Sequence, residues 1–247
     1  MTIGFAGLLS VVWRLFRRDA TLLLPIAGTF VFLPAFAAAL LCDPLPSLPA
    51  GPRSEVAMQA WLSNVALWSQ DNGLWFLLAE LIGTYGIAAI ALFLLEPDRL
   101  TIGQALGQAI VRLVAFTIAT AAMAVPIALG LWLLVLPGLY VQARLIVAVP
   151  AMARHPALKP LASLRLSWKM TKGMDRALTG ALVTLFLVQW LAVSPLLLAD
   201  ESLRSGAGNP LALALVDALI AAVGASYAVA LLLLGVVAYR IRASKGT

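Results

Sequence analysis

The stretch LVAFTIATAAMAVPIALGLWLLVLPGLYVQARLIVAVPAMA, residues 113–153, decides the fold. Its only charged residue is Arg144. A single helix over this stretch would be about 60 Å long, twice the roughly 30 Å of hydrocarbon in a bilayer. Leu136-Pro137-Gly138 is typical of a turn and divides the stretch. We therefore expect two membrane spans, 113–135 and 137–153, joined as a tight hairpin.

The composition of the whole chain places the protein in the membrane class. Hydrophobic residues make up 62% of the 247 residues and charged residues 11%, against about 45–50% and about 25% in soluble domains. The first apolar run is longer than the 7–15 residues or so of a signal peptide, so we interpret it as a retained span. The sequence predicts an all-α polytopic bundle of six spans in one domain over residues 1–247. The four spans besides the hairpin are 21–41, 73–95, 177–199 and 210–239.

The basic residues predict an orientation. Of the 17 lysines and arginines, 14 fall on the side of the two termini, two on the opposite side, and Arg144 lies within a span. An excess of cations marks the cytoplasmic side of a membrane protein. We expect a multi-pass protein of a bacterial inner membrane with both termini in the cytoplasm. The pI of about 10.0 then reflects topology, and no nucleic-acid partner is expected.

Amphipathic segments precede or follow several spans. Residues 4–18 and 54–70 each carry one apolar helical face, which is typical of helices that lie along a membrane surface. Residues 160–172 carry a narrow basic stripe. A surface segment followed by a span occurs three times, at 4–34, 100–126 and 160–195, and suggests three helical hairpin repeats.

Two basic sets are candidate contacts for anionic lipid headgroups on the cytoplasmic side. An ordinary positively charged loop is the alternative interpretation of the second set. The first set, on segment 4–18, is Arg14, Arg17 and Arg18; the second, on segment 160–172, is Arg165, Lys169 and Lys172.

Three ionisable residues lie inside the predicted spans. Glu80, Arg144 and Asp217 each follow the expected outer end of their span by seven residues, which places each about 10 Å below that end. We therefore expect Arg144 to bridge the two carboxylates, with Gln142 in the same polar cluster. The cluster could fix the packing of the helices. It could also line a water-accessible site for a proton, an ion or a headgroup.

No residue pattern indicates catalysis or a bound metal. The chain has one histidine and one cysteine, too few for the usual zinc sites, and contains no nucleophile, metalloprotease or phosphate-loop motif. We predict a protein that is not an enzyme and has no cofactor.

Residues 136–186 resemble a bacterial membrane-protein family, namely the membrane domain fused to some glycerophosphodiester phosphodiesterases and the six-span inner-membrane proteins related to it. The phosphodiesterase active site lies in a soluble domain absent here, so the resemblance implies a six-helix membrane module without catalysis. Family members often have an acidic residue where this chain has Arg154-His155-Pro156. The residues that carry the resemblance are Leu136, Pro137, Gly138, Arg144, Pro150, Ser167, Trp168, Lys172 and Gly173.

These observations lead to one functional expectation and one alternative. We expect a non-enzymatic integral inner-membrane protein with a structural or accessory role in envelope or lipid-related processes. The alternative is a small transporter or channel that uses the layer of Glu80, Arg144 and Asp217. A water-filled path to that layer would favour transport, and a dry, fully paired layer would favour the structural role.

Overall fold

The computed structural model describes residues 4–49, 54–96, 100–205 and 209–244. These residues form helices and connecting segments, with no strand among them. Six helical segments are long and apolar enough to cross a membrane, so the predicted all-α multi-pass class is confirmed. The helices are α1 (Phe5–Ala27), η1 (Gly28–Phe32), α2 (Leu33–Leu41), α3 (Glu55–Leu95), α4 (Ile102–Val111), α5 (Leu113–Leu133), α6 (Val135–Leu145), α7 (Ala148–Arg154), α8 (Pro160–Met170), α9 (Asp175–Ser205) and α10 (Pro210–Ala243).

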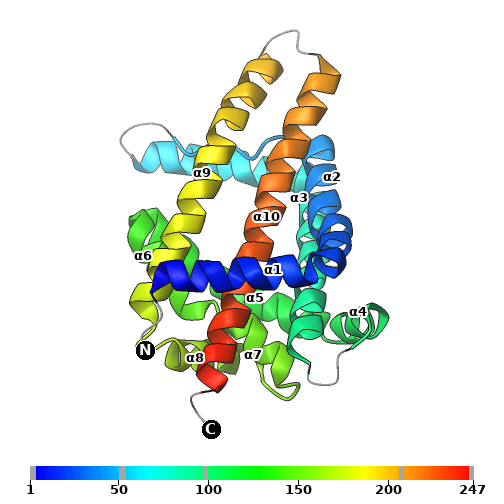
Figure 1. Ribbon diagram of the computed structural model, residues 1–247. Coiled ribbons are helices and arrows are strands. Elements are labelled where there is room, and N and C mark those ends of the chain that lie inside the picture. The colour runs from blue at the N-terminus through cyan, green and yellow to red at the C-terminus, as the bar shows by residue number, and fades with distance from the viewer. Residues whose placement is uncertain (1–3, 50–53, 97–99, 206–208, 245–247) are drawn as a thin grey trace.

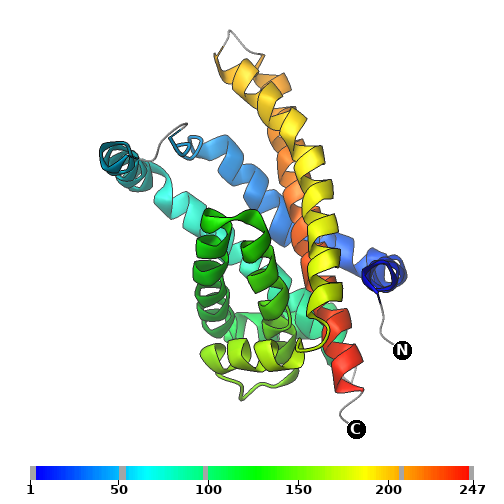
Figure 2. The same ribbon diagram turned by 90° about the vertical axis from the view of Figure 1, so that its left-hand side faces the viewer.

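The first candidate span consists of three consecutive helical pieces. α1 lies across the long axes of α9 and α10, and the short π-helical segment η1 leads from it into α2, which rises beside α3 (Figures 1 and 2). The predicted surface helix 4–18 is therefore the beginning of α1. Leu8, Val12 and Leu15 are buried in the protein core, whereas Phe5 and Trp13 are exposed. The predicted apolar face thus packs partly on the protein itself.

Helix α3 is continuous through a surface segment and a span that the sequence predicts as separate elements. Its first part, light blue in Figure 1, lies across the bundle, and the rest runs down beside α2. The Ser54 side chain caps the helix by accepting from the Ala57 N–H. Trp61 and Trp68 donate their indole N–H groups to the carbonyls of Pro46 and Asp43 at 3.0 and 2.8 Å. These bonds hold the transverse part of α3 against the chain that follows α2.

The α5–α6 hairpin confirms the predicted division of residues 113–153 but places the turn elsewhere. The turn is the single extended residue Leu134, and Pro137 and Gly138 lie in the first turns of α6. Proline suits the start of a helix because its missing N–H has no partner there in any case. A Cβ on Gly138 would lie 2.5 Å from the Leu131 backbone nitrogen. Gly138 therefore permits the close approach of α5 and α6.

Shorter helices precede the second and third hairpins, as the sequence predicts for surface segments. α4 comes before α5 and begins with a capping box in which Thr101 and Gln104 exchange hydrogen bonds. α8 comes before α9, and Gly173 between them has a φ of +84°, a left-handed conformation that favours glycine. α9 and α10 then form a long antiparallel pair, and the C-terminal end of α9 and the N-terminal end of α10 extend beyond the other helices (Figure 1).

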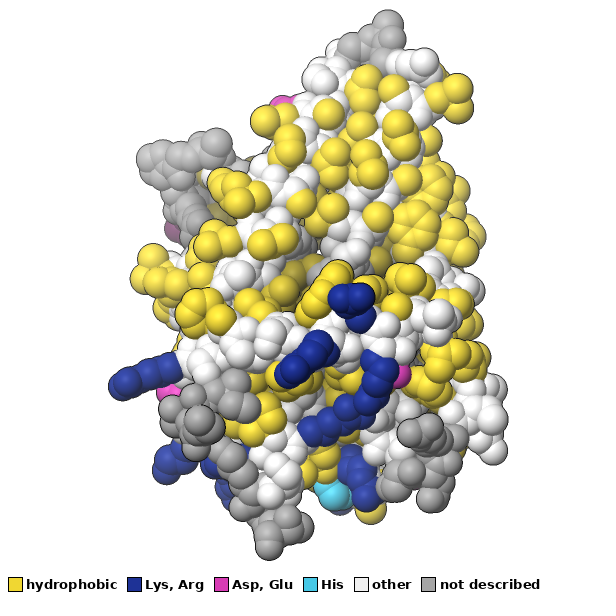
Figure 3. Space-filling view, in the orientation of Figure 1, with side chains coloured by type: hydrophobic (Ala, Val, Ile, Leu, Met, Phe, Trp, Pro, Cys, Tyr) yellow, Lys and Arg dark blue, Asp and Glu magenta, His cyan; other side chains and the backbone are white. Residues whose placement is uncertain are grey.

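The core and the basic side chains share one end of the bundle. Residues 88–95 of α3 and 232–239 of α10 are mostly buried, and they pack with α7. Figure 3 shows lysine and arginine side chains gathered in the lower half of the molecule, while the upper half is largely hydrophobic. Leu187, Val188 and Leu191 of α9 are exposed. Exposed leucine and valine side chains along a span are expected where a helix contacts lipid tails.

Candidate functional site

The guanidinium of Arg144 contacts α8. Arg144 is 5% exposed and donates from Nη2 to the Trp168 carbonyl at 2.6 Å. Its guanidinium carbon lies 4.7 Å from the centre of the Trp168 indole ring. No ion pair among the described residues includes Arg144 or Glu80, and Asp217 pairs with a different arginine. The predicted bridge from Arg144 to the two carboxylates is therefore wrong.

Two helix ends and an aromatic ring compensate the charge of Arg144. Arg144 lies in the last turn of α6, and the carbonyl that it contacts belongs to the last turn of α8. The unpaired carbonyls at a helix C-terminus carry partial negative charge, which favours a cation there. The face of the Trp168 ring adds a cation–π contact. A buried arginine is thus accommodated without a carboxylate.

Hydroxyl groups at the end of α8 and just after it form hydrogen bonds with the backbone at the break between α6 and α7. The Ser167 hydroxyl donates to the Arg144 carbonyl at 2.8 Å and accepts from the Val147 N–H at 3.1 Å. Thr171 also donates to the Arg144 carbonyl, at 3.2 Å. These bonds replace helical hydrogen bonds that the interruption removes, so the buried backbone groups keep partners. Arg144, Ser167 and Trp168, all in the motif of the family resemblance, therefore meet in one place.

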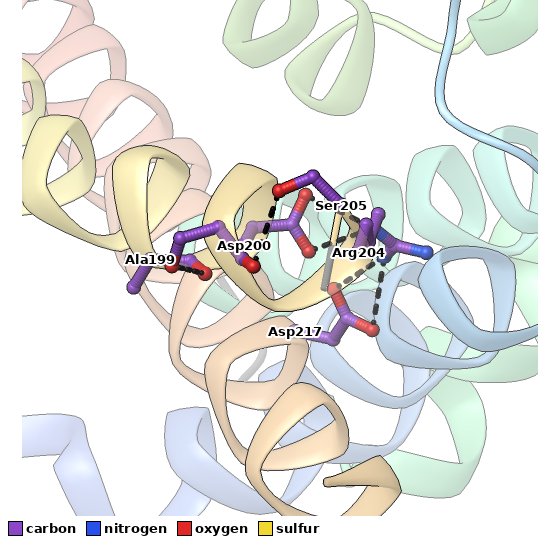
Figure 4. A network of polar contacts seen from close by, with 6 residues as sticks. Ala199, Asp200, Arg204, Ser205 and Asp217 are labelled. Carbon is purple, nitrogen blue, oxygen red and sulfur yellow. Dashed lines mark hydrogen bonds and ion pairs between the residues drawn. The ribbon is translucent and has the colours of Figure 1, made fainter. Parts of the chain in front are cut away.

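Asp217 belongs to a charged network at the far ends of α9 and α10 (Figure 4). Arg204 donates from Nε to both Asp200 oxygens at 2.9 and 3.0 Å. From Nη2 it reaches Asp217 at 3.0 and 3.3 Å. Asp217 is 4% exposed, so Arg204 supplies the charge that the buried carboxylate needs. Arg204 is not among the predicted site residues, although Asp200 and Arg204 have the i,i+4 spacing of a helical ion pair.

Glu80 forms no ion pair with this network, but it lines the same cavity as Asp200 and Arg204. A cavity of about 650 Å³ lies between α2, α3, α9 and α10, and Glu80, Asp200 and Arg204 are among its lining residues. Gln142 lines a different cavity of about 300 Å³ beside α5 and α10. The four residues of the predicted cluster therefore do not come together. Arg144 contacts α8, Gln142 lines its own cavity, and Glu80 and Asp217 lie near the charged network of Arg204. The transport layer of Glu80, Arg144 and Asp217 does not form.

Arg144 and Asp217 lie at different levels because the helices end at different levels. The α5–α6 turn lies well below the upper ends of α9 and α10 in Figure 2. Counting seven residues from each outer end therefore places Arg144 near the basic end of the bundle and Asp217 near the other end.

Several arginines at the basic end bind backbone carbonyls. Arg112 donates to the carbonyls of Met152 and Ala153 at the end of α7, and Arg240 donates to the Leu94 carbonyl at the end of α3. Burial lowers the pKa of Arg112, partly offset by Glu96. These cations stabilise helix C-termini. They are therefore less available to lipid than exposed arginines of the same end.

The predicted headgroup residues are exposed. Arg18 forms an ion pair with Asp19 at 2.7 Å, and within the described ranges no ion pair involves the others. Arg14, Arg17, Arg18, Arg165, Lys169 and Lys172 are all exposed on α1 or on α8 and the turn after it.

An apolar groove lies against α1. It has a volume of about 560 Å³ and is lined by α1, η1, α9 and α10, with Trp13 and Phe16 on the α1 side. A smaller cleft of about 260 Å³ lies between α1 and α10, where Arg14, Arg18 and Arg240 line it. Figure 3 shows basic side chains directly beside the hydrophobic surface at this level.

Comparison of the chain with family models, with curated proteins and with solved structures finds no match.

Replacing Arg204 with glutamine is expected to destabilise the α9–α10 end. The substitution leaves Asp217 buried and Asp200 partly buried without their cation, and we expect a loss of about 1–2 kcal/mol because Arg204 itself is partly exposed. Limited proteolysis of the α9–α10 connection measures the effect as faster cleavage. The triple variant that also carries Asp200→Asn and Asp217→Asn should recover resistance, and equal sensitivity of both variants would contradict this account.

Proposed function

We propose that this protein is a non-enzymatic multi-pass protein of a bacterial inner membrane that holds an anionic phospholipid at its basic end. Its role would be structural or accessory, in envelope or lipid-related processes. The observation that carries the proposal is the apolar groove beside α1, together with the exposed arginines Arg14 and Arg17 on the same helix. The resemblance of residues 136–186 to a six-span module supports the same class.

The groove has the chemistry and size of an acyl-chain site. Apart from Gly28 and Ser226, its lining residues are hydrophobic. Its volume of about 560 Å³ falls within the roughly 300–1,000 Å³ typical of ligand sites. An apolar groove that faces the membrane favours lipid tails over water.

Helical geometry places Arg14 and Arg17 on the outward side of α1, between the apolar groove and the smaller cleft, which Arg14 lines. At 3.6 residues per turn, Trp13 and Phe16 point into the groove while Leu8 and Leu15 face the protein core. Arg14 and Arg17 fall on the remaining outward side, and both are exposed. A phosphate there would meet two cations while its tails enter the groove.

Charge complementarity favours an anionic headgroup over a neutral one. The basic end corresponds to the side that the lysine and arginine distribution predicts to be cytoplasmic, where anionic lipids attract cations. Each lysine or arginine near such a surface contributes about 1 kcal/mol. Arg14 and Arg17 together therefore supply about 2 kcal/mol of preference, or about 30-fold in affinity.

Lipid retention tests the proposal. The protein is purified from membranes that contain phosphatidylglycerol and phosphatidylethanolamine, and native mass spectrometry counts the bound lipids. We expect retained phosphatidylglycerol on the wild-type protein and about a 30-fold weaker interaction in the Arg14→Gln, Arg17→Gln variant.

The matched control variant is Arg165→Gln with Lys169→Gln, which removes the same charge from exposed positions of α8, away from the groove. Its phosphatidylglycerol retention should stay close to that of the wild-type protein. Equal loss in both variants would mean that total charge, and no site at α1, determines retention.

A further inference from the structure

The cavity that contains Glu80 combines apolar walls with fixed charges. It has a volume of about 650 Å³, and residues of α2, α3 and α10 form most of its wall, with alanine the most frequent residue type. At one end Asp43 and Trp68 belong to the lining, and at another Thr84 and Thr120. Such a cavity suits a ligand with an apolar body and a charged group.

The carboxylate of Glu80 has no counter-ion in the described part of the chain. No hydrogen bond or ion pair there involves its side chain, although Glu80 lies within a membrane-spanning helix. An ionised group at such a position is costly unless it meets water or an opposite charge. The cavity in front of Glu80 can supply either.

The charged side chains that line the cavity carry a net negative charge. Arg204 is already held by Asp200 and by Asp217 behind it (Figure 4). Asp43 and Glu80 then add negative charge to the lining. The electrostatics of the cavity therefore favour a cation and disfavour an anion at Arg204.

Two aromatic rings lie in the same wall. Trp68 and Phe76 pack edge to face with ring centres 5.6 Å apart, and both line the cavity. The hydrogen bond from the Trp68 indole to the Asp43 carbonyl fixes the position of that ring. Aromatic faces attract organic cations, whose charge is spread over apolar groups.

We infer that the cavity between α2, α3, α9 and α10 binds a lipophilic organic cation, such as an ammonium or phosphonium carried on an apolar body. Glu80 is its counter-ion, Trp68 and Phe76 contact its apolar groups, and Arg204 stays within the aspartate network. A metal ion fits less well, because the described residues contain no cluster of three metal-ligating side chains.

Tetraphenylphosphonium and tetraphenylborate test this inference, because the two ions share shape and apolar surface but have opposite charge. Equilibrium dialysis against the protein in phosphatidylcholine nanodiscs, with empty nanodiscs subtracted, gives the bound amount of each. We expect saturable binding of tetraphenylphosphonium and no saturable binding of tetraphenylborate. In the Glu80→Gln variant the affinity for tetraphenylphosphonium should fall about tenfold.

Glu201→Gln is the matched control, since Glu201 is exposed on α9 and does not line the cavity. Its affinity for tetraphenylphosphonium should equal that of the wild-type protein. Glu80→Gln removes no described contact, so its thermal unfolding should be unchanged. Equal binding of both ions, or equal affinity of wild type and Glu80→Gln, would overturn the inference.

Discussion

The Arg144→Met variant is expected to unfold at a clearly lower temperature than the wild-type protein. Methionine fills similar space but leaves the Trp168 carbonyl with only the longer hydrogen bond from the Thr171 hydroxyl, at 3.4 Å, at a cost of about 1–3 kcal/mol. It also removes the stacking on the indole ring, about 0.5–2 kcal/mol. We expect a total loss of about 2–4 kcal/mol, measured by thermal unfolding in detergent with circular dichroism.

A matched surface variant separates this effect from a general loss of charge. Arg165 is exposed on α8, and Arg165→Met should change stability by no more than about 0.5 kcal/mol. A similar effect of both substitutions would contradict the buried contact.

Double-variant cycles identify the partner of Arg144. Residues in contact show non-additive effects, and residues far apart add. Trp168→Leu combined with Arg144→Met should cost less than the sum of the two single changes. Asp217→Asn combined with Arg144→Met should be additive, because Asp217 pairs with Arg204 at the other end of the bundle. A non-additive effect of Asp217→Asn and Arg144→Met would instead support the predicted bridge between Arg144 and that carboxylate.

The spans could be predicted from sequence because hydrophobic length is a local property. Each apolar run exceeds what a soluble helix needs, and the lysines and arginines between the runs separate into two sides. The surface helices were predictable for the same reason, since their apolar faces repeat with helical period. The extent of α3 was not predictable, because Asn72-Gly73 is typical of a turn and yet the helix runs through both residues.

The site was harder to predict because it depends on relative levels. The predicted common depth of Glu80, Arg144 and Asp217 requires that all spans end in one plane. However, α9 has 31 residues and α5 has 21, a difference of about 15 Å in length. The partner of Arg144 is also a backbone carbonyl. Every residue has such a carbonyl, so no residue type marks it, whereas a search for side-chain partners returns Glu80 and Asp217. The break at residues 146–147 is indicated in the sequence only by Pro150, which cannot donate to the Ile146 carbonyl and whose ring crowds that carbonyl in a regular helix.

A second large effect is expected at Gly235, where α10 packs against that break. A Cβ at Gly235 would collide with the Ile146 carbonyl oxygen and lie 3.2 Å from the Pro150 ring. The Ile146 carbonyl is part of the backbone that Ser167 holds through Val147 and Arg144, so it cannot yield without breaking those bonds. Overpacking of this kind costs about 1–3 kcal/mol, and more for a branched side chain. We expect about 2–3 kcal/mol for Gly235→Ala by thermal unfolding and a larger loss for Gly235→Val.

Gly224 of the same helix provides the control, because a Cβ there meets no atom within 4 Å. Gly224→Ala should stabilise the protein by about 0.5–1 kcal/mol through helix propensity alone. The same propensity gain acts at Gly235, so the difference between the two alanine variants isolates the collision with the break. If both variants were stabilised equally, α10 could not lie as close to residues 146–150 as described. The α6–α7 break would then be held by its hydrogen bonds to α8 without close packing against α10.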